Sequence, residues 1–397
     1  MQQSTEPRID VRVGSSKLTL LGTAHISRAS ANEVRDLLQS GDYDAVAVEL
    51  CPSRYDSLMD PDALAHMDLF TAIRKGRAYM VMATLALGAY QKRLADHLGI
   101  EPGAEQRTAV SLAREQHLPV LLVDREIGVT LRRVAGNLGW WKRLVLFSGI
   151  LATLLSREEI AEEEVERLKE GDVLETTFAE LAQDRRDLYI PLIEERDRYM
   201  AARLRLEIAD KGHENLLAVL GAGHIRGVSS HLLSDQGQDP KAEIQELECL
   251  PRPSPWPKLI PWIIVVLILL GFGYGFSRSP HLGWQVVLDW VLINGGLSAL
   301  GAAIAAAHPL TIVTAFLAAP LTSLNPTIGA GMATGAVELY LRRPRVADFG
   351  RLREDTTEIK GWWRNRVSRT LLVFVFSTLG SAIGTYIAGL RILDRLF

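Results

Sequence analysis

The chain lacks the features that mark several common classes of protein. Its 397 residues include only two cysteines, Cys51 and Cys249, which excludes a disulfide framework and favours a reducing compartment. Its net charge of -3 provides no basic face for nucleic acid, so we expect no DNA or RNA partner. The first residues, MQQSTEPRIDVRV, lack the apolar core of a secretory signal. An H-E-x-x-H motif is also missing, which excludes a zincin.

Charge is scarce in one part of the chain. Residues 259–397 contain long uncharged runs, whereas residues 1–250 carry most of the charge. Prolines alternate through residues 251–258, PRPSPWPK, which cannot continue a helix and should be extended and stiff. We therefore expect a soluble domain at 1–250, a proline-rich linker at 251–258 and a transmembrane domain at 259–397.

One short pattern occurs twice in the soluble part, as LTLLGTAH at 18–25 and as LLAVLGAGH at 216–224. Each copy is typical of a buried strand, a tight Gly-x-x-His turn and the start of a helix. A third apolar run, DAVAVEL, contains Glu49 near its end. Because ligands of open α/β sheets bind outside the carboxyl ends of the strands, we expect His25, Glu49 and His224 to converge on one site.

Other runs alternate between strand and helix patterns. Residues 9–13 and 17–21 predict a hairpin, and residues 119–123 predict a further strand, with helices between the strands. Residues 157–211 are charged and predict a helical insertion. The predicted fold class is an α/β soluble domain, with a mainly parallel sheet covered by helices, followed by an all-α transmembrane domain.

Two shorter apolar runs in the soluble part leave alternatives open. Residues 78–90 are too few to cross a bilayer and favour a buried helix. Residues 144–155 follow paired tryptophans beside Lys142 and Arg143. That composition is typical of a helix on a membrane surface, and a core or subunit-contact helix explains it equally well.

Two imidazoles and one carboxylate are a sufficient protein ligand set for a catalytic metal with an open position. His25, Glu49 and His224 supply such a set. The alternative is that each histidine only caps a helix and that Glu49 pairs with Arg54. Both can hold, with Arg54 orienting the carboxylate or binding substrate. No base is tied to Cys51 by sequence, so it is a poor nucleophile candidate.

The predicted transmembrane domain contains three long apolar runs, at 259–276, 284–307 and 371–390, each long enough to span. Residues 309–341 differ, because Pro320 and Asn325 with its following proline split them into pieces too short to span. We expect these residues to form a broken, re-entrant hairpin, although two short crossings remain the alternative.

Charge in the loops sets the expected orientation. Residues 342–369 hold nine Lys or Arg against four acids, so the positive-inside rule puts this loop and the soluble domain in the cytoplasm. Asp289, Asn325 and Glu338 are polar groups in or near the apolar segments. Intramembrane acids are functional candidates, but Glu338 lies four residues from Arg342 and could simply pair with it at the interface.

Several motifs together resemble the TraB, PrgY and GumN family, which also contains the TIKI proteins. They are GTAH at 22–25, VAVELCPSRY at 46–55, VLLVDREIGVTLRR at 120–133, ERDRYMA at 195–201 and GAGH at 221–224. The carboxyl half, with AHPLTIVTAFLAAPLTSLNPTIGAG at 307–331, resembles the membrane-anchored TraB and PrgY branch, named for shutting down peptide pheromones in conjugation.

The resemblance implies particular roles for matching residues. TIKI relatives are regarded as manganese- or cobalt-dependent proteases, which makes His25 and His224 metal residues and Glu49 a ligand or general base, with Arg54 as helper; zinc is a further option. Asp124, Arg125 and Arg196 match the motifs, and we expect them to bind substrate. Asp124 and Arg125 also end a predicted strand, where a structural ion pair is an equal alternative.

The expected protein is therefore a metal-dependent hydrolase, a peptidase, anchored in the inner or plasma membrane of a prokaryotic cell. A peptide-binding or sequestering protein without catalysis is the first alternative, and a transporter built on the broken hairpin is the second. A homodimer is expected, because Gly380 and Gly384 have the small-xxx-small spacing of helix contacts and residues 144–155 offer a second surface.

Overall fold

The computed structural model describes residues 7–23, 28–59, 68–98, 103–139, 141–143, 145, 148, 185–235, 237–250 and 256–397. The chain divides into two compact units. The N-terminal unit comprises Met1–Pro61 and Leu94–Arg252, and the helical unit comprises Asp62–Arg93 and Pro253–Phe397. Residues 62–93, which the sequence analysis assigned to the soluble domain, thus group with the carboxyl-terminal helices.

The N-terminal unit is built on a five-stranded sheet with the strand order β1-β2-β5-β3-β4. Its strands are β1 (Arg8–Val13), β2 (Ser16–Thr23), β3 (Ala45–Val48), β4 (Val120–Leu122) and β5 (Asn215–Gly221). Only β1 is antiparallel, joined to β2 through Gly14 at a φ of 62°, as the expected hairpin requires. The other neighbours are parallel, with Leu20 and Ala47 both opposite Ala218. The sheet is therefore mixed and mainly parallel.

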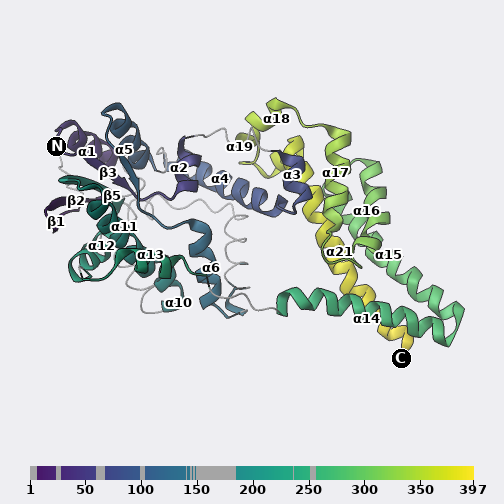
Figure 1. Cartoon of the computed structure of the whole chain (residues 1–397). Helices are drawn as coiled ribbons and strands as arrows, with labels where there is room; N and C mark the ends of the chain where they lie inside the picture. The colour runs from purple at the N-terminus through teal and green to yellow at the C-terminus, as the bar shows by residue number, and fades with distance from the viewer. Residues whose placement is uncertain are drawn as a thin grey trace. The chain divides into compact units, whose positions relative to one another are not determined.

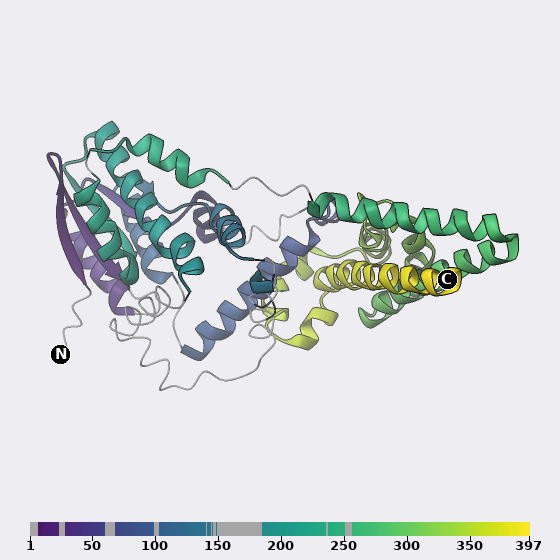
Figure 2. The ribbon, with the colours of Figure 1, turned by 90° about the horizontal axis from the view of Figure 1, so that it is seen from below.

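Helices cover both faces of this sheet (Figures 1 and 2). On one face, α1 (Arg28–Gln39) and α5 (Ala104–Glu115) bury Val34, Leu38 and Val110 against Val46 and Val219. On the other face, α11 (Glu195–Lys211) and α12 (Ala222–Ser234) pack on the alternate strand residues. Because successive side chains of a strand point to opposite faces, the continuous apolar runs of β2 and β5 serve both layers.

The N-terminal unit has further helical segments. They are α2 (Pro52–Met59), α6 (Ile127–Asn137), α10 (Arg186–Tyr189), the π-helical turn η2 (Ile190–Glu194) and α13 (Pro240–Glu248). The predicted helical insertion at 157–211 lies partly outside the described residues, and its described end forms α10, η2 and α11.

A buried ion-pair cluster joins α6 to α11. Glu195 accepts from Arg133 Nε at 2.6 Å, from Arg133 Nη2 at 2.7 Å and from Arg125 Nη1 at 2.8 Å. Arg125 also donates to the Pro191 carbonyl at 2.8 Å and to the Leu247 carbonyl at 3.2 Å. These bonds fix the π-helical turn and the end of α13 to one point.

The helical unit contains α3 (Leu69–Arg74), α4 (Ala78–Leu98), α14 (Trp256–Arg278), α15 (Pro280–Ile304), α16 (Pro309–Thr322), α17 (Ala330–Arg342), α18 (Val346–Gly350), α19 (Leu352–Asp355), α20 (Ile359–Arg364) and α21 (Arg366–Leu396). Three segments are long and apolar enough to cross a membrane, namely Leu259–Arg278, Pro280–Ile304 and Arg366–Leu396. These are the three segments that the apolar runs predicted. Residues 78–90 lie in α4, whose Leu85 is buried beside Phe374 of α21.

The broken segment forms two antiparallel helices, α16 and α17. Glu338, near the end of α17, accepts from His308 N at 2.9 Å and from Thr311 Oγ1 at 2.6 Å, both at the start of α16. The outer ends of the two helices are therefore adjacent, as in a hairpin that returns to the side from which it started. Glu338 also lies 2.7 Å from Arg342 Nε, which is the pairing that the spacing suggested.

The glycine stripe of α21 contacts a helix of the same chain. A Cβ on Gly380 would lie 2.2 Å from the Leu297 carbonyl oxygen, and one on Gly384 would lie 2.8 Å from Asn294 Cα. Both glycines thus let α15 approach α21 closely. This stripe is occupied within the chain, and the second proposed association surface, 144–155, lies largely outside the described residues.

We expect Glu195→Gln to lower the free energy of unfolding by about 3 kcal/mol at neutral pH, because it leaves the buried guanidinium of Arg125 and the half-buried one of Arg133 without their charged partner. Burial opposes ionisation of Glu195, but the two arginines outweigh it and hold the pKa of this carboxyl below its usual value. A depressed pKa contributes stability above the unfolded pKa, about 4.3 for Glu, and loses it as the pH falls through the folded pKa.

Denaturation of the full chain in mild detergent at several pH values measures this difference, which should shrink below about pH 4. The matched control is Glu246→Gln, a largely exposed acid whose nearest cation, Arg198 Nη2, lies 3.9 Å away, and it should change stability little. Equal losses for the two variants would contradict the assigned role of the cluster.

We expect Gly380→Ala to destabilise the helical unit by about 1–3 kcal/mol, because the new methyl group must push α15 away from α21. Gly389→Ala is the control on the same helix, since its Cβ would meet no atom within 4 Å among the described residues. That change should be neutral or slightly stabilising through helix propensity. Thermal unfolding in detergent measures both, and a stable Gly380→Ala protein would contradict the close contact.

Candidate functional site

Polar side chains gather where the parallel strands end. Glu49 directly follows β3, Asp124 lies two residues after β4, and His224 lies in the first turn of α12 after β5. The carboxyl ends of these strands share one edge of the sheet. The structure thus brings Glu49 and His224 together, with Glu49 Oε1 3.6 Å from His224 Nε2. His25, after β2, lies outside the described residues.

Arg196, from the first turn of α11, joins the two acids. Its Nη2 lies 2.6 Å from Glu49 Oε1 and 2.9 Å from Asp124 Oδ2, and its Nε lies 3.0 Å from Asp124 Oδ1. Glu49 is 3% exposed and Asp124 is 5% exposed. Burial lowers the pKa of Arg196, but the two carboxylates outweigh it and raise that pKa above the ordinary value. Arg196 is therefore a fixed positive charge between two buried acids.

His224 is oriented by a further acid, Asp197. Its Nδ1 lies 2.6 Å from Asp197 Oδ1, and its Nε2 lies 3.1 Å from Arg196 Nη1. Burial lowers the pKa of His224, but Glu49 and Asp197 raise it by more than burial lowers it. The pKa of His224 is therefore above its ordinary value. An arginine can only donate, however, so the contact at Nε2 favours the neutral ring with its proton on Nδ1, facing Asp197. That tautomer turns the lone pair of Nε2 toward Glu49 and Arg196.

Backbone geometry holds these groups in place. Gly221 N donates to Glu49 Oε2 at 2.6 Å, at the amino end of α12 where the helix dipole favours negative charge. A Cβ on Gly227 would lie 2.0 Å from Asp197 Oδ2, so glycine at this position allows α11 and α12 to approach closely. Burial raises the pKa of Asp197, against the lowering effect of its bond to His224.

The sequence analysis missed Asp197 as a site residue. Its only signal was its position directly after Arg196 in ERDRYMA. The π-helical turn η2 precedes α11, and such turns are frequent at functional sites because they re-aim the residues that follow. Here Arg196 and Asp197 are adjacent in sequence, and both reach His224.

The described donor set fits part of a divalent metal site. Two ligands about 2.1 Å from one ion are about 3.4 Å apart at a tetrahedral angle. The separation of Glu49 Oε1 and His224 Nε2 is close to this value, and a carboxylate on the other ring nitrogen is the usual support of a metal-binding histidine. Among the residues that the structure describes, no three His, Cys, Asp or Glu are placed to hold a metal together.

The two remaining predicted residues of this domain differ in their surroundings. Arg54 has a side chain that is 43% exposed, and its Nη1 lies 3.4 Å from Asp124 Oδ2. The partner of Glu49 is thus Arg196, 147 positions away, where the sequence suggested Arg54. Arg125 is 1% exposed and belongs to the cluster around Glu195, which matches the structural ion-pair alternative.

The polar residues of the helical unit are internally bonded. Asp289 pairs with Arg395 near the end of α21, and Asn325 Oδ1 accepts from Thr327 N at 3.1 Å in the turn between α16 and α17. Glu338 fixes that hairpin's outer ends, as described above. Each of the three predicted residues therefore has a structural partner.

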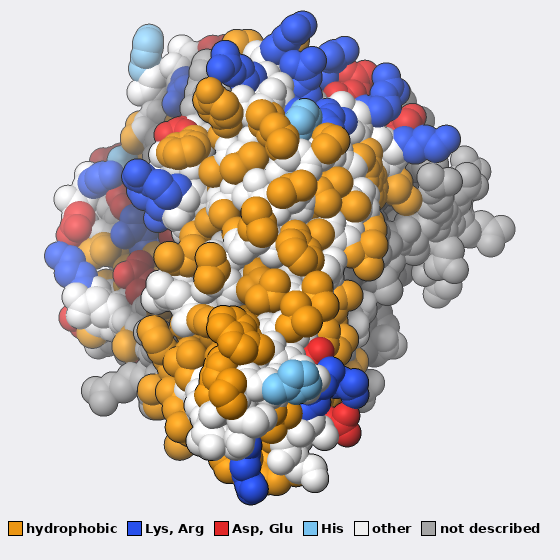
Figure 3. Space-filling view, turned by 90° about the vertical axis from the view of Figure 1, so that its right-hand side faces the viewer, with side chains coloured by type: hydrophobic (Ala, Val, Ile, Leu, Met, Phe, Trp, Pro, Cys, Tyr) orange, Lys and Arg blue, Asp and Glu red, His pale blue; other side chains and the backbone are white. Residues whose placement is uncertain are grey.

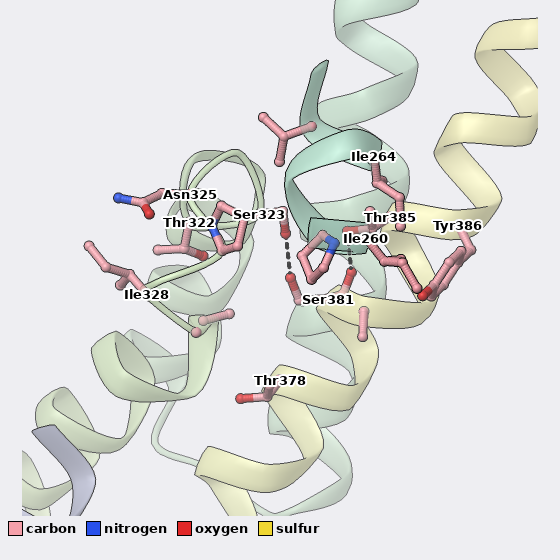
Figure 4. Close-up of a pocket in the computed structure, with 16 residues that line it drawn as sticks. Ile260, Ile264, Thr322, Ser323, Asn325, Ile328, Thr378, Ser381, Thr385 and Tyr386 are labelled. Carbon is pink, nitrogen blue, oxygen red and sulfur yellow. Dashed lines mark hydrogen bonds between the residues drawn. The ribbon is translucent and has the colours of Figure 1, made fainter. Parts of the chain in front are cut away.

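A pocket of about 210 Å³ lies at the turn of the hairpin. Figure 4 shows Ser323 and Ser381 facing each other in it, with their oxygens 2.7 Å apart. Asn294 donates to Thr385 Oγ1 at 2.9 Å, and its Oδ1 lies 3.2 Å from each serine oxygen, where it can accept a hydroxyl proton. This network joins α15, the hairpin and α21. The pocket is lined by hydroxyl residues of the hairpin and α21 and by aliphatic residues, several of them from α14.

Comparisons with known proteins extend over nearly the whole chain. The family model described as the TraB/PrgY/gumN family matches residues 9–240, and the model described as the TraB family protein, C-terminal domain, matches residues 256–397. An uncharacterized protein of Methanocaldococcus jannaschii is 32% identical over 382 residues, which are 94% of each chain.

Mammalian relatives match a smaller share. A TraB domain-containing protein of Bos taurus is 29% identical over 295 residues, 69% of this chain and 76% of the relative. The TraB domain-containing protein of Homo sapiens is 30% identical over 261 residues, 60% of this chain and 67% of the relative. The strand-end motifs, the helical unit and these matches agree, and the chain belongs to the TraB family.

Proposed function

We propose that this protein is a membrane-anchored, metal-dependent hydrolase that acts on peptides. The observation that carries the proposal is the approach of Glu49 Oε1 and His224 Nε2 to 3.6 Å at the carboxyl edge of the sheet. The third ligand would be His25, which the family resemblance adds. Manganese or cobalt, with zinc as the other option, suits a site of imidazole and carboxylate donors.

Asp197, Glu49 and Arg54 have separate roles in this proposal. Asp197 keeps the proton of His224 on Nδ1, so that Nε2 can act as a ligand. Glu49 serves as ligand or general base. Arg54, partly exposed beside Asp124, is available to bind a carboxylate of the substrate. The bound ion would polarise the scissile carbonyl and lower the pKa of a bound water.

Arg196 has a particular part in this proposal. Its guanidinium contacts both Glu49 and His224 and so occupies the position of a cation. Loading of a metal requires Arg196 to leave both Glu49 Oε1 and His224 Nε2, and Asp124 is the acid that can still hold its guanidinium. Arg196 and Asp124 would then line the site beside the ion and meet the substrate.

Membrane anchoring rests on the three candidate spanning helices. With the basic loop at 342–369 on the cytoplasmic side, the N-terminal unit lies in the cytoplasm and the pair α16 and α17 forms a re-entrant hairpin. A relative from Methanocaldococcus jannaschii matches over 94% of each chain, which supports the plasma membrane of a prokaryotic cell.

A peptide-binding protein without catalysis is the second candidate. The specific observation in its favour is the closed network of Arg196, Glu49, Asp124 and His224, which is charge-compensated without any metal. Such a protein would bind peptide equally well after treatment with EDTA.

We expect the purified full-length chain to bind one Mn²⁺ or Co²⁺ and to cleave peptides in a reaction that EDTA abolishes. Elemental analysis and a peptide-cleavage assay should show the loss of both properties in His25→Ala, Glu49→Gln and His224→Ala, because each removes a ligand. His231→Ala is the control on the same helix as His224, since His231 pairs with Asp235 outside the site. A wild-type chain that takes up no Mn²⁺, Co²⁺ or Zn²⁺ would contradict the proposal.

We expect Asp197→Asn to weaken metal binding by about tenfold to a hundredfold while leaving the fold intact, because it removes the carboxylate that orients His224. Calorimetric titration with Mn²⁺ measures the change. Asp235→Asn, which alters the corresponding partner of His231, is the matched control. An unchanged affinity in Asp197→Asn would show that His224 needs no such support.

A further inference from the structure

One end of the helical unit is assembled from segments far apart in the sequence. Leu69 and Ile73 of α3 share a buried cluster with Leu352 of α19 and with Val367 and Phe374 of α21. Phe349 of α18 and Trp362 of α20 pack against the same cluster. The turn between α3 and α4 therefore lies beside residues 343–364, and the charges of both segments belong to one surface.

This surface carries exposed cations without acidic partners. None of the nine exposed cations at 68–77 and 343–364 forms a salt bridge with a carboxylate among the described residues. Six of them we call the basic end: Arg74, Lys75, Arg77, Arg345, Lys360 and Arg364. Five acids lie in the same two segments. Asp348 Oδ2 accepts from the Arg345 backbone at 2.7 Å, Asp355 Oδ2 accepts from Asn365 at 2.9 Å, and Asp68 Oδ1 accepts from Thr71 N at 3.0 Å. Glu354 and Glu358 are exposed, so the surface has fewer acids than cations.

The opposite end of the unit is different. There Arg395 pairs with Asp289, and Arg391 Nη1 lies 2.8 Å from Asp394 Oδ2. Two of the three arginines described at that end are thus matched by acids, and Arg278 donates to Tyr274 Oη. At the basic end the exposed cations outnumber the acids. Figure 3 shows Lys and Arg gathered at one end of the helical unit, above a broad field of hydrophobic side chains.

Large apolar side chains are exposed among the cations. Val346 is 83% exposed, and Phe70, Tyr340 and Ile359 are also exposed. Trp363 donates to the Ile304 carbonyl at 2.9 Å, which places it at the carboxyl end of α15, a candidate spanning helix. Exposed apolar and aromatic groups interspersed with Lys and Arg at the end of such a helix are the composition of a membrane interface.

We propose that the basic end binds the phosphate groups of anionic phospholipids, and that the turn between α3 and α4, Arg74–Lys75–Gly76–Arg77, is part of the binding surface. The proposal rests on the membrane anchoring proposed above. Guanidinium and ammonium groups donate charge-assisted hydrogen bonds to phosphate oxygens. A lipid surface fits better than a soluble anion, because it also takes up the exposed side chains of Val346 and Ile359, which a soluble anion would leave in water.

Two triple variants test the surface, one in each segment. They are Arg345→Gln with Lys360→Gln and Arg364→Gln, and Arg74→Gln with Lys75→Gln and Arg77→Gln. The control changes three exposed cations of the N-terminal unit, Arg12→Gln with Arg35→Gln and Lys241→Gln, and so alters the net charge equally. Native mass spectrometry of the full chain in detergent, titrated with phosphatidylglycerol or phosphatidylcholine, measures lipid binding.

We expect the wild type and the control to prefer phosphatidylglycerol, and each test variant to lose about a hundredfold of that affinity at low salt, since each basic residue contributes roughly fivefold at an anionic surface. High salt should reduce the preference by screening. Test variants that keep the preference, or a control that loses it, would overturn the proposal. Alkaline extraction of membranes that contain the wild type tests the anchoring separately. If the protein stays in the membrane but binds both lipids equally, the lipid proposal is overturned and the anchoring stands. If alkali releases the protein, both proposals are overturned.

Discussion

The sheet edge depends on the compensation of buried negative charge. Glu49 and Asp124 end neighbouring strands, and both side chains are withdrawn from water. Two such carboxylates repel each other and lose hydration, which a protein tolerates only with a cation and hydrogen bonds nearby. The planar guanidinium of Arg196 supplies both, with three bonds to two acids. Arg196 directly follows Glu195 after the π-helical turn, and Arg125 bonds both that turn and Glu195.

Local periodicity accounts for how well the architecture was predicted. The apolar runs that became β2, β3 and β5 are continuous because both faces of a parallel sheet are covered, and the two Gly-x-x-His sequences marked the ends of strands. The convergence of Glu49 and His224 followed from the rule for strand ends alone. The apolar runs likewise marked the three long helices of the helical unit.

Contacts between distant segments account for what was missed. Glu49 has Arg54 as its nearest arginine in sequence, yet it pairs with Arg196, because helix direction and not sequence distance decides which side chain reaches a strand end. Asp197 carried no periodic signal. The spacing of the glycines of α21 predicted a contact with a second copy of the chain. Such spacing indicates that a helix packs closely but does not identify the partner helix, and these glycines contact α15.

The grouping of residues 62–93 with the carboxyl-terminal helices affects the order in which the chain can fold. Ile73 lies in one buried cluster with Phe374, so its partner leaves the ribosome about 15 to 60 s later at ordinary rates of synthesis. During that interval the apolar face of α3 and α4 has no native surface to cover it. The nascent N-terminal half therefore exposes apolar surface on α3 and α4, and we expect a chaperone or the lipid surface to cover it until α21 is synthesised.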